Sequence, residues 1–165
     1  MILPILHYPD KRLRTIAKEV KSFDNSISIL VDDMFETMYE APGIGLAATQ
    51  INHHQRIIVI DISDNKNEPL CLINPVISEE LGKTESEEGC LSVPDYFEPV
   101  KRYDSIRVNA VNQKGKPFEI QASSLLSICI QHEVDHLNGI LFVDHLSKLK
   151  QSRLIKKAKK SGKEL

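Results

Sequence analysis

The sequence has few cysteines and no long apolar run, and each shortage excludes a class of protein. Only three cysteines occur in 165 residues, Cys71, Cys90 and Cys129, which is too few and an odd number for a disulfide framework. We therefore expect a reducing compartment, where each thiol serves packing, metal binding or catalysis. No stretch approaches the ~18 consecutive apolar residues that a membrane span requires, so we expect no membrane association.

The first residues also lack the features of a secretory signal. Residues 1–6 are apolar, but Pro4 interrupts them and the charged run 10–12 follows at once. We expect a soluble, cytoplasmic protein. With 41% apolar residues, a chain of 165 residues suffices for one core and is too short for two ordinary domains. The predicted organisation is a single domain over residues 1–165.

The net charge of -2 is unevenly distributed along the chain. Residues 148–165 contain eight lysines and arginines against one acid, Glu164, so this basic tail carries +7 and the remaining 147 residues carry -9. Two interpretations remain open. The tail is either a solvated basic helix or a contact surface for a polyanion such as RNA, where its cations would replace condensed counterions.

Hydrophobic periodicity predicts an amphipathic helix over residues 25–40, which Pro42 ends because proline disfavours helical geometry in the residue before it. Strands are predicted from the apolar and β-branched runs at 56–62, 70–73, 105–111 and 117–122. The last two form a predicted hairpin, with a turn at residues 112–115.

Two further helices are predicted in the C-terminal part. The segment 123–138 is apolar on most sides, so it belongs in the centre of the fold; Ser123 or Ser124 can cap it, and Gly139 can end it in a left-handed turn. A last helix over residues 147–160 carries the basic side chains. Its thin apolar stripe consists of Leu149, Leu154, Ile155 and Ala158.

The glycine-rich stretch 42–50 fits the pattern of a dinucleotide-binding turn, with Gly43, Gly45 and Ala48 at the pattern positions. Such a turn must follow a strand and open a helix, so that the pyrophosphate meets the helix N-terminus. Here the predicted order is helix, glycine loop, strand. No Gly-Lys-Ser/Thr follows either, which excludes a P-loop, so the glycines do not indicate a nucleotide.

The central helix carries His132-Glu133-Val134-Asp135-His136. Two histidines four residues apart lie on one helix face and can bind a single metal ion, with Glu133 beside them in reach of a coordinated water. The five-residue pattern is only moderately specific, because two histidines packed in a core give the same spacing.

A catalytic metal site of this type needs a third protein ligand and an open position. In metzincins the third histidine would lie six residues after His136, but that position is Phe142 here. Another class of zinc peptidase uses a downstream glutamate, and the only glutamate after Glu133 is Glu164, in the basic tail. The spacing of His145 fits no known arrangement, so a solvent-facing or packing role is expected for it. Upstream, Cys90 follows a glycine and could complete a Cys-His-His set, although a free cysteine is usually buried and inert.

Three segments together resemble the three signature motifs of the peptide deformylases, in the same order and at similar spacing. They are Gly43-Ile44-Gly45-Leu46-Ala47-Ala48-Thr49-Gln50, Glu88-Gly89-Cys90-Leu91-Ser92 and Gln131-His132-Glu133-Val134-Asp135-His136-Leu137-Asn138-Gly139. The resemblance covers nearly the whole chain and is to the bacterial class with a helical C-terminus. It implies an α+β fold of mostly antiparallel sheets around a central metal-binding helix, with a C-terminal helix.

The resemblance also implies an activity, the removal of the formyl group from the N-terminal formylmethionine of nascent polypeptides with release of formate. It makes Cys90, His132 and His136 the metal ligands, with one Fe2+ per chain, although Zn2+, Ni2+ or Co2+ can occupy the same site. Glu133 becomes the general acid/base. By the same resemblance, the Gln50 side-chain amide and the Leu91 backbone N–H stabilise the oxyanion.

The resemblance also implies which residues bind the substrate. A formyl carbon bears only hydrogen, so close backbone approach at Gly43, Gly45 and Gly89 could admit it and exclude larger acyl groups. The family builds its unbranched apolar slot for methionine at positions that correspond here to Ile44, Leu125, Ile128 and Cys129. The glycine-loop strand is expected to pair with the substrate backbone.

Some residues depart from patterns common in the family. Residues 95–102 include two aromatic residues, Tyr96 and Phe97, where many relatives have small or basic residues, and Pro42 stands where several have an acid. These differences concern the pocket rim and the preference for residues after formylmethionine. A pairing of Glu88 with Arg102 is a further hypothesis.

Two other functions stay open from the sequence. One is a metallopeptidase that cleaves internal bonds, and the other is a metal-stabilised, non-catalytic RNA-binding domain that works through its basic tail. Because the substrate is on the ribosome, the C-terminal helix is also a candidate ribosome contact. We expect a monomer.

Overall fold

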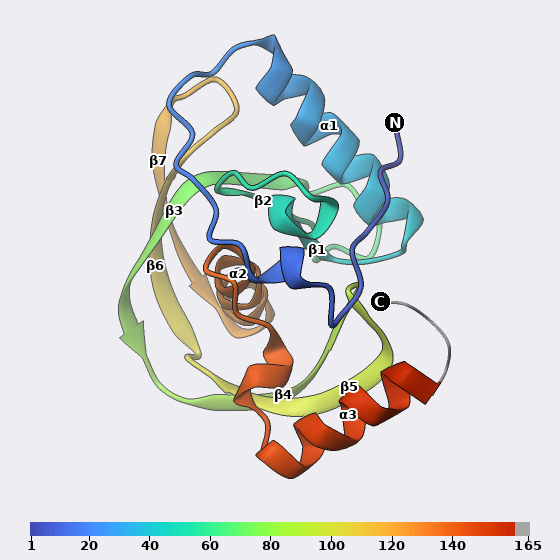
Figure 1. The fold of residues 1–165 in the computed structure, drawn as a ribbon. Helices are drawn as coiled ribbons and strands as arrows, with labels where there is room; N and C mark the ends of the chain where they lie inside the picture. Colours follow the sequence, from blue (N-terminus) through green and yellow to red (C-terminus); the bar gives the residue numbers. More distant parts are fainter. Residues whose placement is uncertain (161–165) are drawn as a thin grey trace.

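The computed structural model describes residues 1–160 and has an α+β fold, as predicted (Figure 1). Its helices are α1 (Asn25–Glu40), α2 (Ser124–Leu137) and α3 (Lys148–Lys160), with short 3-10 helices at Lys11–Arg14, Ala48–Ile51 and Phe142–His145. Its strands are β1 (Gly45–Ala47), β2 (Ile57–Ile60), β3 (Leu70–Leu81), β4 (Thr84–Cys90), β5 (Val93–Arg102), β6 (Ser105–Val111) and β7 (Pro117–Ser123). Figure 1 shows α2 in the centre, with strands around it and α1 and α3 on the outside.

The strands form a five-stranded sheet in the order β1-β2-β3-β6-β7 and a separate hairpin of β4 with β5, and every pair is antiparallel. The predicted β6–β7 hairpin is confirmed. The strand predicted at 70–73 covers only the start of β3, because the later half of β3 is largely exposed and loses the apolar run. The β4–β5 hairpin was not predicted, since β4 is polar and β5 contains Pro94 and Pro99.

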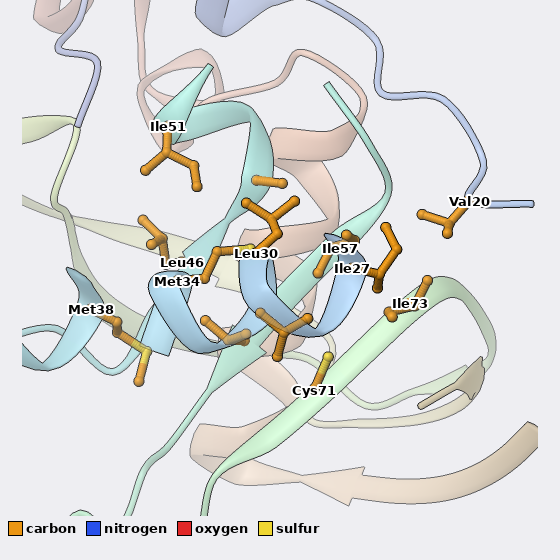
Figure 2. Close-up of a cluster of buried hydrophobic side chains, with 13 residues drawn as sticks. Val20, Ile27, Leu30, Met34, Met38, Leu46, Ile51, Ile57, Cys71 and Ile73 are labelled. Atoms are coloured by element: carbon orange, nitrogen blue, oxygen red, sulfur yellow. The ribbon is translucent and has the colours of Figure 1, made fainter. Parts of the chain in front are cut away.

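Strand β2 is buried on both faces, which explains its unbroken β-branched sequence. Alternate side chains point to opposite sides of a strand, so Ile57 and Val59 join the cluster under α1, which Figure 2 shows, whereas Ile58 and Ile60 join the cluster around α2. The sheet therefore separates the two helices and supports α2 from one side.

The ends of α2 agree only in part with the sequence prediction. Ser123 is the N-cap residue, as predicted, but its side chain makes no capping hydrogen bond. Strand β7 runs directly into the helix, and the Ser124 backbone N–H instead donates to the Asp104 carbonyl at 2.9 Å. At the other end, Gly139 has φ +74°, and a Cβ there would lie 2.6 Å from the Arg14 carbonyl oxygen. The left-handed turn is therefore confirmed.

Helix α3 packs one face against the body of the protein. Leu154 and Ala158 are buried, but Leu149 is 61% exposed, so its predicted place in the apolar stripe is wrong. Leu149 lies five residues before Leu154 and hence about 140° around the helix from it. Of the predicted basic tail 148–165, residues 161–165 lie outside the described part. No helix within residues 1–160 is long and apolar enough to cross a membrane.

Candidate metal centre

The central helix turns its histidine motif inward. His132, Glu133 and His136 are only 8%, 4% and 0% exposed, because α2 packs against β1, β2 and β7. Since residues four apart share one helix face, both imidazoles point to the same place. The apolar sequence of the helix thus positions polar groups that would be costly to bury without a partner.

Strand β4 ends at this place and brings in Cys90. Its Sγ lies 3.3 Å from Nε2 of His136, and the two histidine Nε2 atoms are 3.3 Å apart. All three donor atoms lie within 4.8 Å of one another. His145 lies apart from them and is half-exposed, with its Nε2 atom 3.0 Å from Asp135 Oδ2. The structure therefore brings together the three residues that the resemblance implied as ligands.

The donor set fits a transition-metal ion. One sulfur and two imidazole nitrogens are the ligand types of catalytic Cys-His-His sites. The other ring nitrogen of His132, Nδ1, is 2.9 Å from Glu88 Oε1, which leaves Nε2 for the cluster. Burial and the neighbouring His132 hold the pKa of His136 well below its ordinary value, which favours the neutral form of this ring.

The predicted pairing of Glu88 with Arg102 is confirmed. Arg102 donates from Nε to Glu88 Oε2 at 2.8 Å and from a terminal nitrogen to Oε1 at 2.9 Å. Burial alone raises the pKa of Glu88, but the hydrogen bonds from Arg102 and His132 outweigh burial and lower it to about 2. Arg102 also donates to Asp135 at 2.7 Å, a contact that no sequence pattern indicated.

One carboxylate oxygen of Glu133 is buried without a hydrogen-bond partner among residues 1–160. This atom is Oε1, in a side chain that is 4% exposed. Burial raises the pKa of this carboxyl to about 7. Gly45 lies directly against the carboxylate, and a methyl group on Gly45 would overlap Oε2. The close approach requires glycine there.

The amide of Gln50 is fixed at both ends. Its Oε1 accepts from the Ala47 backbone N–H at 2.9 Å, and its Nε2 donates to Ser92 Oγ at 3.0 Å. This nitrogen also lies 3.6 Å from Cys90 Sγ. Ser92 is part of the second motif. No local sequence pattern indicates its contact with Gln50, because the two residues lie in segments that are distant in the sequence.

A cavity of about 630 Å³ opens onto these groups. Its walls include Leu91 and every residue assigned above to substrate binding: Gly43, Ile44, Gly45, Gly89, Leu125, Ile128 and Cys129. A Cβ on Gly43 would lie 2.7 Å from Leu91 Cδ1. Cys129 is 7% exposed and also packs in the core, and burial raises its thiol pKa to about 12. Asp95 and Phe97, from the segment 95–102 that was expected to concern the pocket rim, also line the cavity. The wall residues that were not predicted are Ile5, His7, Ala41, Ser86, Glu87 and Pro94.

Comparison with known proteins identifies the same family as the motifs. The polypeptide deformylase family model matches residues 2–152. The peptide deformylase of Cellvibrio japonicus is 58% identical, over 98% of this chain and 96% of the relative. That of Chromobacterium violaceum is 55% identical, over 99% and 98% of the two chains.

Solved structures agree with this assignment. A crystal structure of a peptide deformylase from Legionella pneumophila has a TM-score of 0.94 at 49% identity and covers 98% of this chain and 96% of that one. The Ehrlichia chaffeensis peptide deformylase, solved in complex with actinonin, has a TM-score of 0.94 at 43% identity and 98% coverage of both chains. The chain therefore belongs to the peptide deformylase family, the metal-dependent hydrolases that remove the formyl group from the N-terminus of nascent polypeptides.

Proposed function

We propose that this site hydrolyses the formamide bond of N-terminal formylmethionine and releases formate, and that Glu133 is its general acid/base. The observation that carries the proposal is the unpartnered, buried Glu133 oxygen, in the wall of a cavity that also contains Cys90 and His132. A carboxyl group with a pKa near 7 is suited to accept and return a proton at neutral pH.

Cys90, His132 and His136 are proposed to hold one metal ion per chain. The ligand chemistry supports Zn2+, Ni2+ or Co2+ as well as Fe2+, and the choice of Fe2+ follows from the family resemblance. When bound, such an ion lowers the pKa of a coordinated water from ~15.7 toward ~7 and polarises a carbonyl group.

The groups around the metal position are proposed to transfer the proton and to stabilise the developing negative charge. Glu133 takes the proton of the attacking water and returns it to the departing amine. The Nε2 group of Gln50 and the backbone N–H of Leu91 donate to the formyl oxygen as negative charge develops on it. Loss of one such donor typically costs about 2.7–4 kcal/mol in the barrier. The hydrogen bonds with the Ala47 N–H and Ser92 Oγ support this role, because they hold the amide in place beside Cys90.

The cavity walls are proposed to select the substrate. Ile44, Leu125, Ile128 and Cys129 form the slot for the methionine side chain, and glycines 43, 45 and 89 allow close approach of the formyl group. Strand β1 lies at the edge of its sheet, so it can pair with an extended peptide by strand addition.

We also propose the setting in which the enzyme works. A monomer of one domain acts in the cytoplasm, where nascent chains emerge from ribosomes, and the exposed lysines of α3 contact ribosomal RNA. Support for this contact is the charge of the helix, whose polar face carries lysines 148, 150, 156, 157, 159 and 160.

Release of formate from peptides tests the central proposal. Metal-loaded protein is expected to release formate from formyl-Met-Ala and to leave unformylated Met-Ala peptides intact. Cleavage of an internal peptide bond would instead indicate a peptidase. No turnover of either peptide would contradict the proposal.

A further inference from the structure

A second cavity, of about 490 Å³, lies beside the buried ion pairs of Arg102. Residues from α2, from the later parts of β3 and β5 and from the segment around His145 enclose it. Within residues 1–160, no residue lines both cavities: Glu88 lines the catalytic one, and Arg102 lines the second. The volume is that of a small-molecule site, ~300–1,000 Å³. A ligand in this cavity would therefore be distinct from the peptide substrate.

Arg102 gives the second cavity a buried cation, with a side chain that is only 4% exposed. Its Nε and one terminal nitrogen donate to Glu88, and the other terminal nitrogen, Nη1, donates to Asp135 at 2.7 Å. Nη1 also lies 3.5 Å from Nε2 of His145. Because Asp135 and His145 both line the second cavity, the Nη1 end of the guanidinium is directed towards it. A guanidinium has five N–H groups, so a ligand there can accept a further hydrogen bond.

Two lysines without ion-pair partners add positive charge to the rim of this cavity. Lys83 and Lys101 line it and are exposed. Among residues 1–160, Lys150 is the only lysine in an ion pair, so both ammonium groups can bind a ligand. The wall also contains two carboxylates, of which Asp135 is already bound by Arg102 and His145. Glu80 is therefore the one opposing charge, and the unpaired groups of the rim have a positive sum.

The remaining wall residues are mainly apolar. Ile77 and Val134 are partly buried and pack against the cluster around α2. Tyr103 is 40% exposed, and its backbone is held by Gln131, which accepts from its N–H at 3.0 Å and donates to its carbonyl at 2.8 Å. The cavity thus combines an apolar surface with a cationic rim, which suits a ligand that has one apolar and one anionic part.

We propose that the second cavity is a binding site for phosphate monoesters that carry an apolar or aromatic group. A phosphate monoester has close to two negative charges at pH 7.5, so it can attract both lysines, whereas a carboxylate offers a single charge. Lysine binds phosphate as a point charge, and arginine adds directed N–H groups. The phosphate contacts Lys83, Lys101 and Nη1 of Arg102, and the organic group packs on the apolar wall.

Phenyl phosphate is the probe for this site. It is titrated at low salt into the zinc-loaded, 15N-labelled protein, and the backbone amide signals report binding. We expect saturable shifts at Ile77, Lys83 and Tyr103, with a Kd of about 1 mM or lower, and a weaker affinity in 0.5 M NaCl because salt screens exposed charges. Absence of shifts at these amides, or shifts confined to Gly43 and Gly45 in the catalytic cavity, would overturn the inference.

Three further compounds separate the two parts of the ligand. Inorganic phosphate lacks the apolar group and phenol lacks the charge, so each should bind at least about tenfold more weakly than phenyl phosphate. Benzoate, with one negative charge, should bind about threefold more weakly or worse. Inorganic phosphate or benzoate that binds as tightly as phenyl phosphate would overturn the assigned class of ligand.

Substitutions at the rim then test the residues. The double variant Lys83→Gln/Lys101→Gln removes both unpaired cations from exposed positions and should raise the Kd for phenyl phosphate about tenfold. Glu80→Gln should act in the opposite direction and lower the Kd about twofold, because it removes the unpaired carboxylate. The control Lys114→Gln/Lys116→Gln makes the same change in net charge outside both cavities and should keep the wild-type Kd. The amide spectrum shows whether each variant is folded. An unchanged Kd in the folded Lys83/Lys101 variant, or an equal rise in the control, would overturn the assignment.

Discussion

The Nδ1 atom of His132 lies 2.9 Å from Oε1 of Glu88, and this contact joins the candidate metal centre to a buried ion-pair network. Glu88 accepts two hydrogen bonds from Arg102, which also binds Asp135. The orientation of one imidazole thus depends on residues from β4, β5 and α2 together.

The substitution Glu88→Gln tests this dependence. The amide keeps the size of the side chain but removes the charge that orients His132 and balances Arg102. We expect metal affinity to fall by about 10–100-fold, the usual effect of losing such a partner. Competition with a chelator of known affinity measures this effect. The neighbouring exposed substitution Glu87→Gln is the control, and equal affinity in both variants would contradict the orienting role.

Replacement of Glu133 by glutamine tests the general acid/base. Glutamine fits the same space but cannot take up a proton, so kcat should fall by about 10²–10⁴-fold. Metal content should be retained, because the three proposed ligands are untouched. Formate release and metal analysis on the same sample separate the two effects. A fully loaded variant that keeps wild-type turnover would remove Glu133 from the mechanism.

Asp61 gives a prediction about stability and pH. Its side chain is 3% exposed and accepts from Tyr39 Oη at 2.6 Å and from the Ser63 and Glu68 backbone N–H groups. Burial raises the pKa of Asp61, but the hydrogen bonds from Ser63 and Tyr39 outweigh burial and lower it below the ordinary value. A carboxyl group with a lowered pKa in the folded state stabilises above its unfolded pKa, near ~3.9, and loses that contribution as pH falls through the folded pKa.

We therefore expect Asp61→Asn to reduce the free energy of unfolding by about 1–3 kcal/mol at pH 7. The difference from the wild type should stay constant down to about pH 5 and then shrink as pH falls past ~3.9 and through the lowered folded pKa, because the wild-type carboxylate then becomes protonated. Urea unfolding at several pH values measures the difference. The exposed substitution Asp32→Asn on α1 is the control, and a difference that stays constant with pH would contradict the role of the charge.

The sequence predicted those parts of the molecule that depend on local pattern. Helix α1 follows from its apolar periodicity, and the β6–β7 hairpin follows from its turn. The β4–β5 hairpin has no comparable pattern, because β4 is mostly polar and β5 is interrupted by Pro94 and Pro99. Without the family resemblance, Cys90 was only one possible third ligand, since it lies 42 positions before His132 and no local spacing relates them. The Arg102–Asp135 contact depends entirely on tertiary packing.

The proposed ribosome contact calls for a test that leaves the core intact. Deleting residues 148–165 would remove Leu154, which is 5% exposed and packs in the cluster with Leu13 and Phe142, so lost activity would not isolate the charge. The exposed pair Lys156 and Lys157 avoids this difficulty. In Lys156→Gln/Lys157→Gln, ribosome affinity should fall, and the slope of log affinity against log salt should decrease by about two, because each lost phosphate contact releases about one counterion fewer.

Turnover of formyl-Met-Ala by this variant should match the wild type, since α3 contributes no residue to the cavity wall. The control replaces two exposed lysines at the β6–β7 turn, Lys114→Gln/Lys116→Gln, and should leave the salt dependence unchanged. A general effect of net charge would lower ribosome affinity equally in both double variants, whereas a contact through α3 affects only the first. Equal binding by all three proteins would therefore remove α3 as the ribosome-binding element, without affecting the assignment of the metal centre.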